Sequence, residues 1–148
     1  MMKSDPAVRR FRVVCVFALL SALFAPAVAS AAAEFPFDQQ LMLDVARMGP
    51  VRRVPSVIVS ADGTARLELW CKTTSAQVAV NDSAIQIVPA PLPEALPQYM
   101  SDGQCSPERM TADLDLVGAL SQVGRWQMAS GVITLDGPSV LHFRPSDH

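Results

Sequence analysis

The stretch Thr64-Ala65-Arg66-Leu67-Glu68-Leu69-Trp70-Cys71 decides the fold, because apolar and polar residues alternate along it. Successive side chains of a β-strand point to opposite faces of a sheet. One face then carries Ala65, Leu67, Leu69 and Cys71, and the other carries Arg66, Glu68 and Trp70. The pattern predicts a half-buried strand that follows a turn at Asp62-Gly63.

Similar runs occur on both sides of this strand. Residues Val54 to Ser60 are rich in β-branched side chains and should pair with it as a hairpin through Asp62-Gly63. Phe35 to Asp44 is expected to be an extended lead-in. Further short strands are expected at Ala76 to Val80, Ser83 to Val88, Trp126 to Met128, Val132 to Leu135 and Val140 to Phe143. The sequence predicts a mainly β (α+β) domain with a small curved antiparallel sheet or a barrel-like meander.

One helix is expected to pack on this sheet. Ser106-Pro107-Glu108 offers a cap, a proline at the first helical position and an acid in the first turn. The expected apolar stripe consists of Met110, Leu114, Val117 and Leu120, with Gly124 as the closing cap. The stripe could also bind a partner or a membrane, but packing on the chain's own sheet is the simpler interpretation.

A proline-rich stretch interrupts the strands before the helix. Four prolines lie between Pro89 and Pro97, where they cannot donate to a strand ladder. We expect an extended connector, with a ligand for a proline-recognising module as the alternative. Gln98-Tyr99-Met100 is a further candidate strand.

The chain begins with the three parts of a secretory signal peptide. Basic residues from Lys3 to Arg12 precede an apolar run from Val13 to Ala25, and Ala27-Val28-Ala29 is a small-x-small cleavage site. The apolar run is shorter than the roughly 20 residues that span a bilayer, although an uncleaved anchor is the alternative. We expect cleavage of residues 1–29 and a periplasmic or secreted single domain over residues 30–148.

Charge limits the partners of the mature domain. The signal segment holds four of the 12 Lys and Arg and one of the 14 Asp and Glu, which leaves eight basic against 13 acidic residues, a net charge of −5. No basic cluster remains that could neutralise a phosphate backbone, so we expect no nucleic-acid partner. We expect a monomer without a membrane anchor, whose partner is an envelope protein or a small ligand.

Two cysteines remain after cleavage, because Cys15 leaves with the signal segment. Disulfides persist in exported proteins, so a bond between Cys71 and Cys105 is the economical hypothesis. Free buried thiols and a redox-active or metal-binding pair are the alternatives. A zinc site lacks ligands, because no Cys-x-x-Cys motif exists and the histidines are His142 and His148.

Together these segments resemble the META domain, the family of the HslJ heat-shock protein. The matching stretches are Arg53 to Val57 with Asp62-Gly63, Leu69-Trp70-Cys71, Asp102 to Cys105, the expected helix from Met110 to Val123, and Gly131 to Phe143. The resemblance implies a barrel-like antiparallel sheet with one helix, an envelope or stress-related role, and neither enzymatic activity nor a cofactor. Where the family commonly has Gly-Cys-Asn, this chain has Trp70-Cys71-Lys72, so the paired cysteines alone carry over.

Candidate catalytic residues are few. His142 alternates away from Leu141 and Phe143, so a surface or rim position is expected rather than a catalytic base. Asp113 and Asp115 are two apart on the expected helix and do not face each other, which favours a solvated face. We expect no catalytic, metal or cofactor site and no enzymatic activity.

Trp70 is the candidate binding residue. If it is exposed beside Arg66 and Glu68, an aromatic flanked by charges suits a binding surface. A closed or two-sided sheet would bury it instead. We therefore expect a non-enzymatic META-type domain with a structural, binding or envelope-stress role, a barrel that binds a small apolar ligand as the alternative, and a hydrolase as a distant third.

Overall fold

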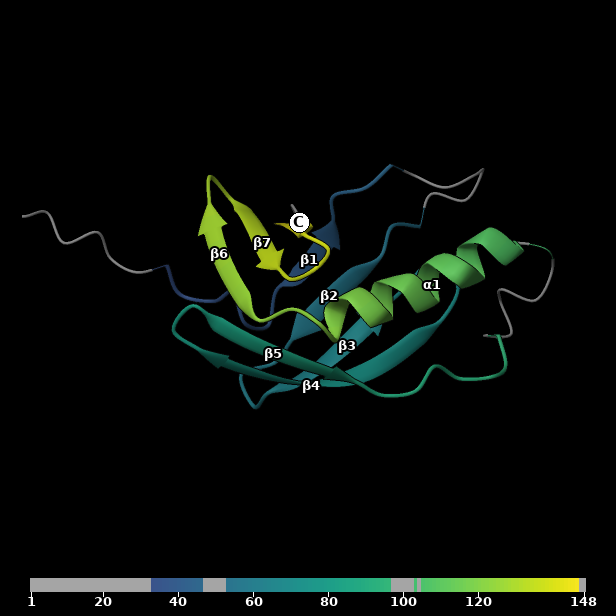
Figure 1. Ribbon diagram of the computed structural model, residues 1–148, viewed down its shortest axis with the longest axis horizontal. Coiled ribbons are helices and arrows are strands. Elements are labelled where there is room, and N and C mark those ends of the chain that lie inside the picture. The colour runs from purple at the N-terminus through teal and green to yellow at the C-terminus, as the bar shows by residue number, and fades with distance from the viewer. Residues whose placement is uncertain (1–32, 47–52, 97–102, 104, 147–148) are drawn as a thin grey trace, which may run out of the picture. The chain divides into compact units, whose positions relative to one another are not determined.

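The computed structural model describes residues 33–46, 53–96, 103 and 105–146. Within these residues the chain forms eight strands and one helix in the order β1 (Gln40–Leu43), β2 (Ser56–Val59), β3 (Thr64–Glu68), β4 (Thr73–Asn81), β5 (Ala84–Pro89), α1 (Pro107–Leu120), β6 (Arg125–Ala129), β7 (Val132–Asp136) and β8 (Leu141–Pro145). The strands pair in chain order into a closed antiparallel barrel (Figure 1). The predicted mainly β fold with one helix is confirmed. Of the two predicted forms of the sheet, the structure has the barrel. The expected signal peptide and the candidate strand at residues 98–100 lie outside the described residues.

The predicted hairpin through Asp62-Gly63 is confirmed. Strands β2 and β3 pair antiparallel, with Val57 opposite Leu67. The Asp62 carboxylate accepts hydrogen bonds from the backbone N–H and the hydroxyl of Thr64, at 2.8 and 2.6 Å, and these bonds lower its pKa. Gly63 has a φ of +85°, and a Cβ there would lie 2.9 Å from the Val78 carbonyl oxygen. Glycine is therefore required at this turn.

Strand β3 ends at Glu68, three residues earlier than the alternation predicts. The N–H of Leu69 donates to the carbonyl of Lys72 at 2.8 Å, and β4 begins at Thr73. Residues 69–72 therefore form a tight turn, which we call the cysteine turn. Side chains in a turn no longer alternate between two faces, so the prediction that Trp70 shares a face with Arg66 fails at this point.

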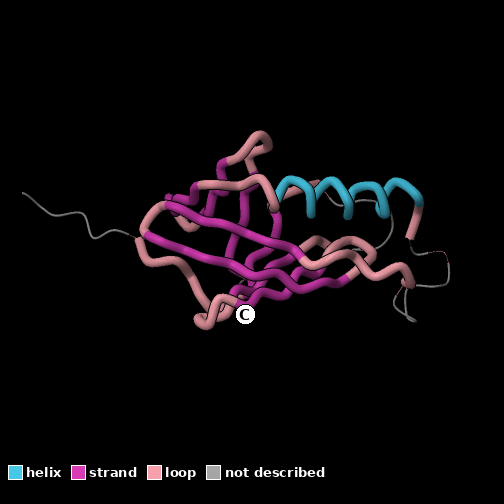
Figure 2. The backbone as a smooth tube through the Cα atoms, turned by 60° about the horizontal axis from the view of Figure 1, so that its bottom comes forward, coloured by secondary structure: helices cyan, strands magenta, loops and turns pink. Residues whose placement is uncertain are grey.

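Helix α1 begins where the sequence predicts and ends earlier than expected. Ser106 is the N-cap, and its hydroxyl accepts a hydrogen bond from Arg109 N–H at 3.4 Å. The helix stops at Leu120 with Ser121 as the C-cap, so Gly124 is not the cap. It lies along the outside of the barrel beside β5 (Figure 2).

The buried face of α1 differs from the predicted stripe. Its buried residues are Arg109, Asp113, Leu116 and Leu120. Leu114, a member of the predicted stripe, is 62% exposed. Leu120 of the predicted stripe is buried and Val117 packs against the core. Two charged side chains occupy the other buried positions, so apolar periodicity alone identifies part of the buried face.

The barrel closes unevenly. Strands β1 and β8 pair over three residue pairs, among them Leu43 with Phe143, and Asp44 forms an ion pair with Arg144 at 3.0 Å. Strands β5 and β6 share one residue pair, Ala84 with Arg125. The β5–β6 seam is therefore the shortest pairing in the barrel, and α1 contacts β5.

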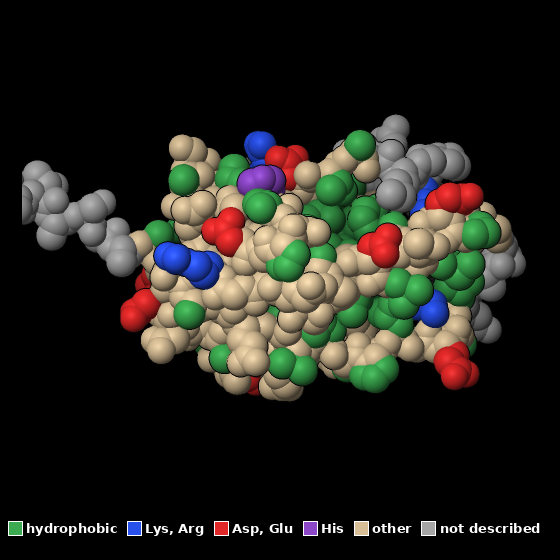
Figure 3. Space-filling view, viewed as in Figure 1, with side chains coloured by type: hydrophobic (Ala, Val, Ile, Leu, Met, Phe, Trp, Pro, Cys, Tyr) green, Lys and Arg blue, Asp and Glu red, His purple; other side chains and the backbone are tan. Residues whose placement is uncertain are grey.

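Apolar side chains from all eight described strands fill the core. The largest fully buried side chains include Phe143, Leu41, Leu67, Leu69, Leu120 and Ile133. The proline-rich connector passes the start of β4, where the Thr74 hydroxyl donates to the Ala90 carbonyl at 3.2 Å. It then reaches the cysteine turn, where the Lys72 ammonium donates to the Pro93 carbonyl at 2.6 Å. No helix among the described residues has the length and apolarity needed to cross a membrane. Charged side chains are scattered over the described face seen in Figure 3, without a large patch of one sign.

Candidate functional site

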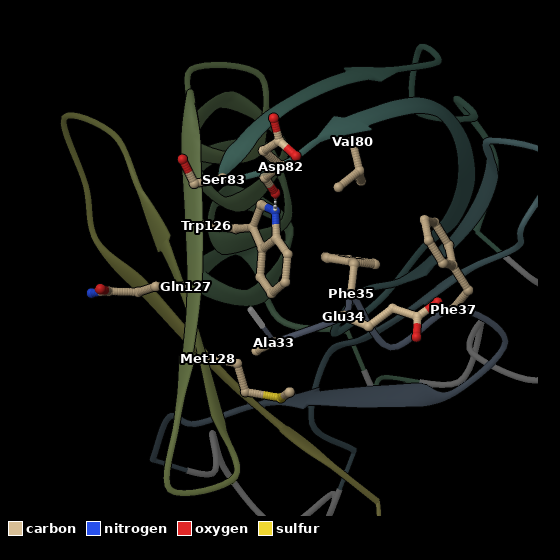
Figure 4. Close-up of a pocket in the computed structure, with 10 residues that line it drawn as sticks. All are labelled: Ala33, Glu34, Phe35, Phe37, Val80, Asp82, Ser83, Trp126, Gln127 and Met128. Carbon is tan, nitrogen blue, oxygen red and sulfur yellow. Dashed lines mark hydrogen bonds between the residues drawn. The ribbon is translucent and has the colours of Figure 1, made fainter. Parts of the chain in front are cut away.

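A pocket opens where the lead-in to β1 meets the turn between β4 and β5 and the start of β6. Its volume is about 640 Å³. The described residues that line it are Ala33, Glu34, Phe35, Phe37, Val80, Asp82, Ser83, Trp126, Gln127 and Met128 (Figure 4). We call it the barrel-end pocket.

Three aromatic side chains form the apolar wall of this pocket. The ring centroids of Phe35 and Trp126 are 5.0 Å apart at an interplanar angle of 87°, an edge-to-face contact. Phe37 lies 5.0 Å from Phe35 with a tilt of 56°. Edge-to-face pairs add roughly 0.5–1.5 kcal/mol beyond the area they bury, so the wall holds its shape without a ligand.

Trp126 is fixed by two hydrogen bonds to the turn between β4 and β5. Its indole Nε1–H donates to the Asp82 carbonyl at 2.7 Å, and its backbone N–H donates to the Ser83 carbonyl at 2.9 Å. Asp82 has a φ of +50°, a conformation that Asp and Asn tolerate better than most residues. The strained turn therefore positions the largest ring of the pocket.

Backbone hydrogen bonds hold the lead-in to β1, which forms another side of the pocket. Asp38 N–H donates to the Val59 carbonyl at 2.7 Å, and Phe37 N–H donates to the Phe35 carbonyl at 2.9 Å. Phe35 is 6% exposed and belongs to the core, whereas Phe37 is half-buried. The lead-in therefore inserts one phenylalanine into the barrel and leaves the next at the pocket.

The structure separates the residues of the predicted binding surface. Trp70 is 6% exposed and packs in the core. Arg66 and Glu68 stay on the outer face of β3 and pair with each other at 3.0 Å. The alternative that a closed sheet buries Trp70 is therefore confirmed. Trp70, Arg66 and Glu68 do not form one binding surface, because the cysteine turn redirects the Trp70 side chain inward.

The cysteine turn is tied to α1 by two links. The predicted bond between Cys71 and Cys105 is present and joins the turn to the residues just before the helix. The Asp113 carboxylate accepts the backbone N–H of Trp70 at 2.8 Å, of Cys71 at 3.1 Å and of Lys72 at 2.9 Å. The prediction of a solvated face is wrong for Asp113, which is 0% exposed, and holds for Asp115, which is exposed.

The electrostatics of Asp113 reflect this enclosure. Burial raises the pKa of its carboxyl above the ordinary value of 3.8, and the N–H groups of Lys72, Cys71 and Trp70, together with the charge of Arg53, offset part of the rise. Every oxygen of the carboxylate is committed to the turn. Asp113 is therefore a structural acceptor that holds the turn rather than a reactive acid.

The remaining sequence candidates lie apart from the pocket. His142 is exposed on β8, and its Nδ1 lies 3.2 Å from the Thr134 hydroxyl. No group of three or more potential metal-ligating side chains exists among the described residues. The pocket residues Phe35 and Trp126 were not predicted as functional. The sequence signal that could have marked Phe35 is the pair of aromatics, Phe35 and Phe37, on a short extended lead-in.

Comparison with known proteins supports the fold and leaves the activity open. No family model matches the chain, and no curated protein matches it. The NMR structure of a protein from Burkholderia xenovorans has a TM-score of 0.54 and 16% identity, and the match covers 81% of this chain and 96% of that one. At this identity the likeness shows a shared fold alone.

A second solved structure is less similar. The crystal structure of a DUF4847 family protein from Bacteroides vulgatus ATCC 8482 has a TM-score of 0.45 and 15% identity. The match covers 64% of this chain, which spans 60% of the length of that protein.

Proposed function

We propose that this protein is a non-enzymatic, exported barrel that binds a small, largely apolar molecule in the barrel-end pocket. The observation that carries the proposal is the aromatic wall of Phe35, Phe37 and Trp126 around a cavity of about 640 Å³. Pockets for small molecules commonly have volumes of roughly 300–1,000 Å³, an apolar lining and few polar groups. Val80 and Met128 extend the apolar lining, and Ser83 adds a hydroxyl.

Pre-organisation favours binding at this place. The lead-in and the Asp82 turn are fixed by backbone hydrogen bonds, and Trp126 is bonded through both its side chain and its backbone. A ligand that enters a wall already ordered does not pay the entropy of ordering it. The pocket therefore needs little rearrangement to accept a flat or branched apolar molecule.

A neutral apolar fluorophore tests the proposal. N-phenylnaphthylamine is expected to bind the protein with a rise in fluorescence, and Phe37→Ala should weaken its binding about tenfold, because burying an aromatic ring contributes roughly 1–2 kcal/mol at a partly exposed site. Phe37 is half-buried, so this variant keeps the core residue Phe35. Fluorescence titration gives both dissociation constants.

Val88→Ala is the matched control. Val88 is 55% exposed on β5 and does not line the pocket. This variant should bind the fluorophore as wild type does. Absence of binding by the wild type, or equal weakening in both variants, would reject the barrel-end pocket as the site.

We also propose that the chain is an envelope protein of the META type, as its sequence resemblance implies. The bond between Cys71 and Cys105 supports this, because such bonds persist in oxidising compartments. Protein from the exported fraction, kept without reductant, should have the intact mass of residues 30–148 less two hydrogens. A full-length or reduced mass would contradict export.

A further inference from the structure

We propose that the ligand of the barrel-end pocket is an organic cation, with an apolar aromatic or branched body and a positively charged group such as a quaternary ammonium. This inference rests on the proposed function and adds the charge of the ligand. It is carried by the sign of the charges around the pocket together with the aromatic rings inside it.

The charged side chains that line the pocket are all acidic. They are Glu34 on the lead-in and Asp82 on the turn between β4 and β5, and both are exposed to solvent. None of the described lining residues is Lys or Arg. In the view of Figure 4 the two carboxylates lie on different sides of the aromatic rings, whereas Gln127 points away from them. The charged side chains around the aromatic rings are therefore all of one sign.

The aromatic rings also favour a positively charged ligand. The faces of Trp, Tyr and Phe carry negative potential and attract a cation within about 6 Å of the ring centre. Phe35, Phe37 and Trp126 bring three rings to one cavity. An aromatic cage around an alkylated ammonium group uses both the ring faces and the methyl surface of the ligand.

Anionic amphiphiles fit the pocket poorly. A carboxylate ligand would lie near Glu34 and Asp82 with no basic lining residue to pair with, and like charges in a partly desolvated site repel. A fatty acid is therefore disfavoured even though its chain would match the apolar wall. Charge, rather than shape, separates the ligand classes here.

Three probes of similar shape and different charge test this inference. Naphthylmethyl-trimethylammonium is the cation, neopentylnaphthalene is its neutral isostere and naphthylacetate is the anion. Calorimetric titration at low ionic strength is expected to show the cation binding about tenfold more tightly than the isostere, and the anion more weakly than both.

Variants assign the preference to the two carboxylates. Glu34→Gln and Asp82→Asn should each weaken binding of the cation about two- to fivefold relative to binding of the neutral isostere by the same variant. Asparagine tolerates the positive φ at position 82, and the backbone carbonyl that accepts the Trp126 indole bond is retained. Glu94→Gln, an exposed acid outside the lining, is the matched control and should keep the full preference.

The outcomes distinguish the inference of a cationic ligand from the proposed function on which it rests. Equal binding of the cation and the neutral isostere, or tightest binding of the anion, overturns the cation inference and leaves an apolar binding pocket. Failure of all three probes to bind overturns both. A cation preference that survives the double variant Glu34→Gln with Asp82→Asn overturns the assignment to these carboxylates.

Discussion

Asp113→Ala is expected to lower the free energy of unfolding by about 3–5 kcal/mol. The change removes the one carboxylate that accepts the backbone N–H groups of Trp70, Cys71 and Lys72, and Asp113 itself is 0% exposed. Buried donors left without an acceptor each cost roughly 1–3 kcal/mol, and the methyl group of alanine also leaves a small cavity. Urea unfolding followed by far-ultraviolet circular dichroism measures the loss.

Asp115→Ala is the matched control, because Asp115 lies on the same helix and is exposed. Its effect should stay within about 0.5 kcal/mol. The loss of unfolding free energy in Asp113→Asn should lie between those of Asp113→Ala and Asp115→Ala. An amide keeps one acceptor oxygen but turns an NH₂ group toward another donor. If Asp113→Ala proves as mild as Asp115→Ala, the carboxylate does not hold the cysteine turn.

The pH dependence of the same variants reports the charge of Asp113. Its pKa in the folded protein is raised by burial above the ordinary value of 3.8. Its contribution to stability is therefore fully present below that value and is lost as pH rises through the pKa of the folded state. The stability of wild type relative to Asp113→Asn should therefore decrease as pH rises above about 4. An increase would mean that the three N–H bonds and Arg53 outweigh burial.

Reduction of the bond between Cys71 and Cys105 is expected to cost about 4 kcal/mol of stability. The two residues are 34 positions apart, and opening a loop of this length restores conformational freedom to the unfolded chain. Such a loss is a large share of the 5–15 kcal/mol that typically holds a domain together. Thermal unfolding of the wild-type protein with and without dithiothreitol measures this loss of stability.

A double variant with alanine at positions 71 and 105 serves as the control. It should be destabilised by a comparable amount and should no longer respond to dithiothreitol. Alanine is preferred to serine because Cys71 is 0% exposed and an added hydroxyl would need a partner. A wild type that unfolds at the same temperature with and without reductant would contradict this prediction.

Local signals predicted the elements well, because their causes lie within a few residues. Asp62-Gly63 specifies the β2–β3 hairpin through a turn that needs glycine, and Ser106-Pro107 specifies the first turn of α1. These features depend on backbone conformation and short-range hydrogen bonds, which neighbouring residue types determine. The order of the strands followed from the same turns.

Features made by distant residues were not predicted. Asp113 reads as a solvated helix residue until the backbone donors of the cysteine turn, some 40 positions earlier, are placed beside it. The alternation places Trp70 on the face of Arg66, but β3 ends at Glu68, before Trp70. The contact of Phe35 with Trp126 joins the lead-in to β6, which lies some 90 positions later in the chain, so no periodicity in either segment predicts the pocket.

The pairing of β1 with β8 has a consequence for the order of events during synthesis. Asp44 and Arg144, which meet across this pair, are 100 positions apart in the chain, and the first strand finds its second neighbour when the last strand has been made. Contacts of such high contact order form slowly and late. A ribosome-bound chain that ends before Leu141 lacks β8 and therefore presents two unpaired strand edges, on β1 and on β7. The barrel therefore cannot close before translation has passed its last strand.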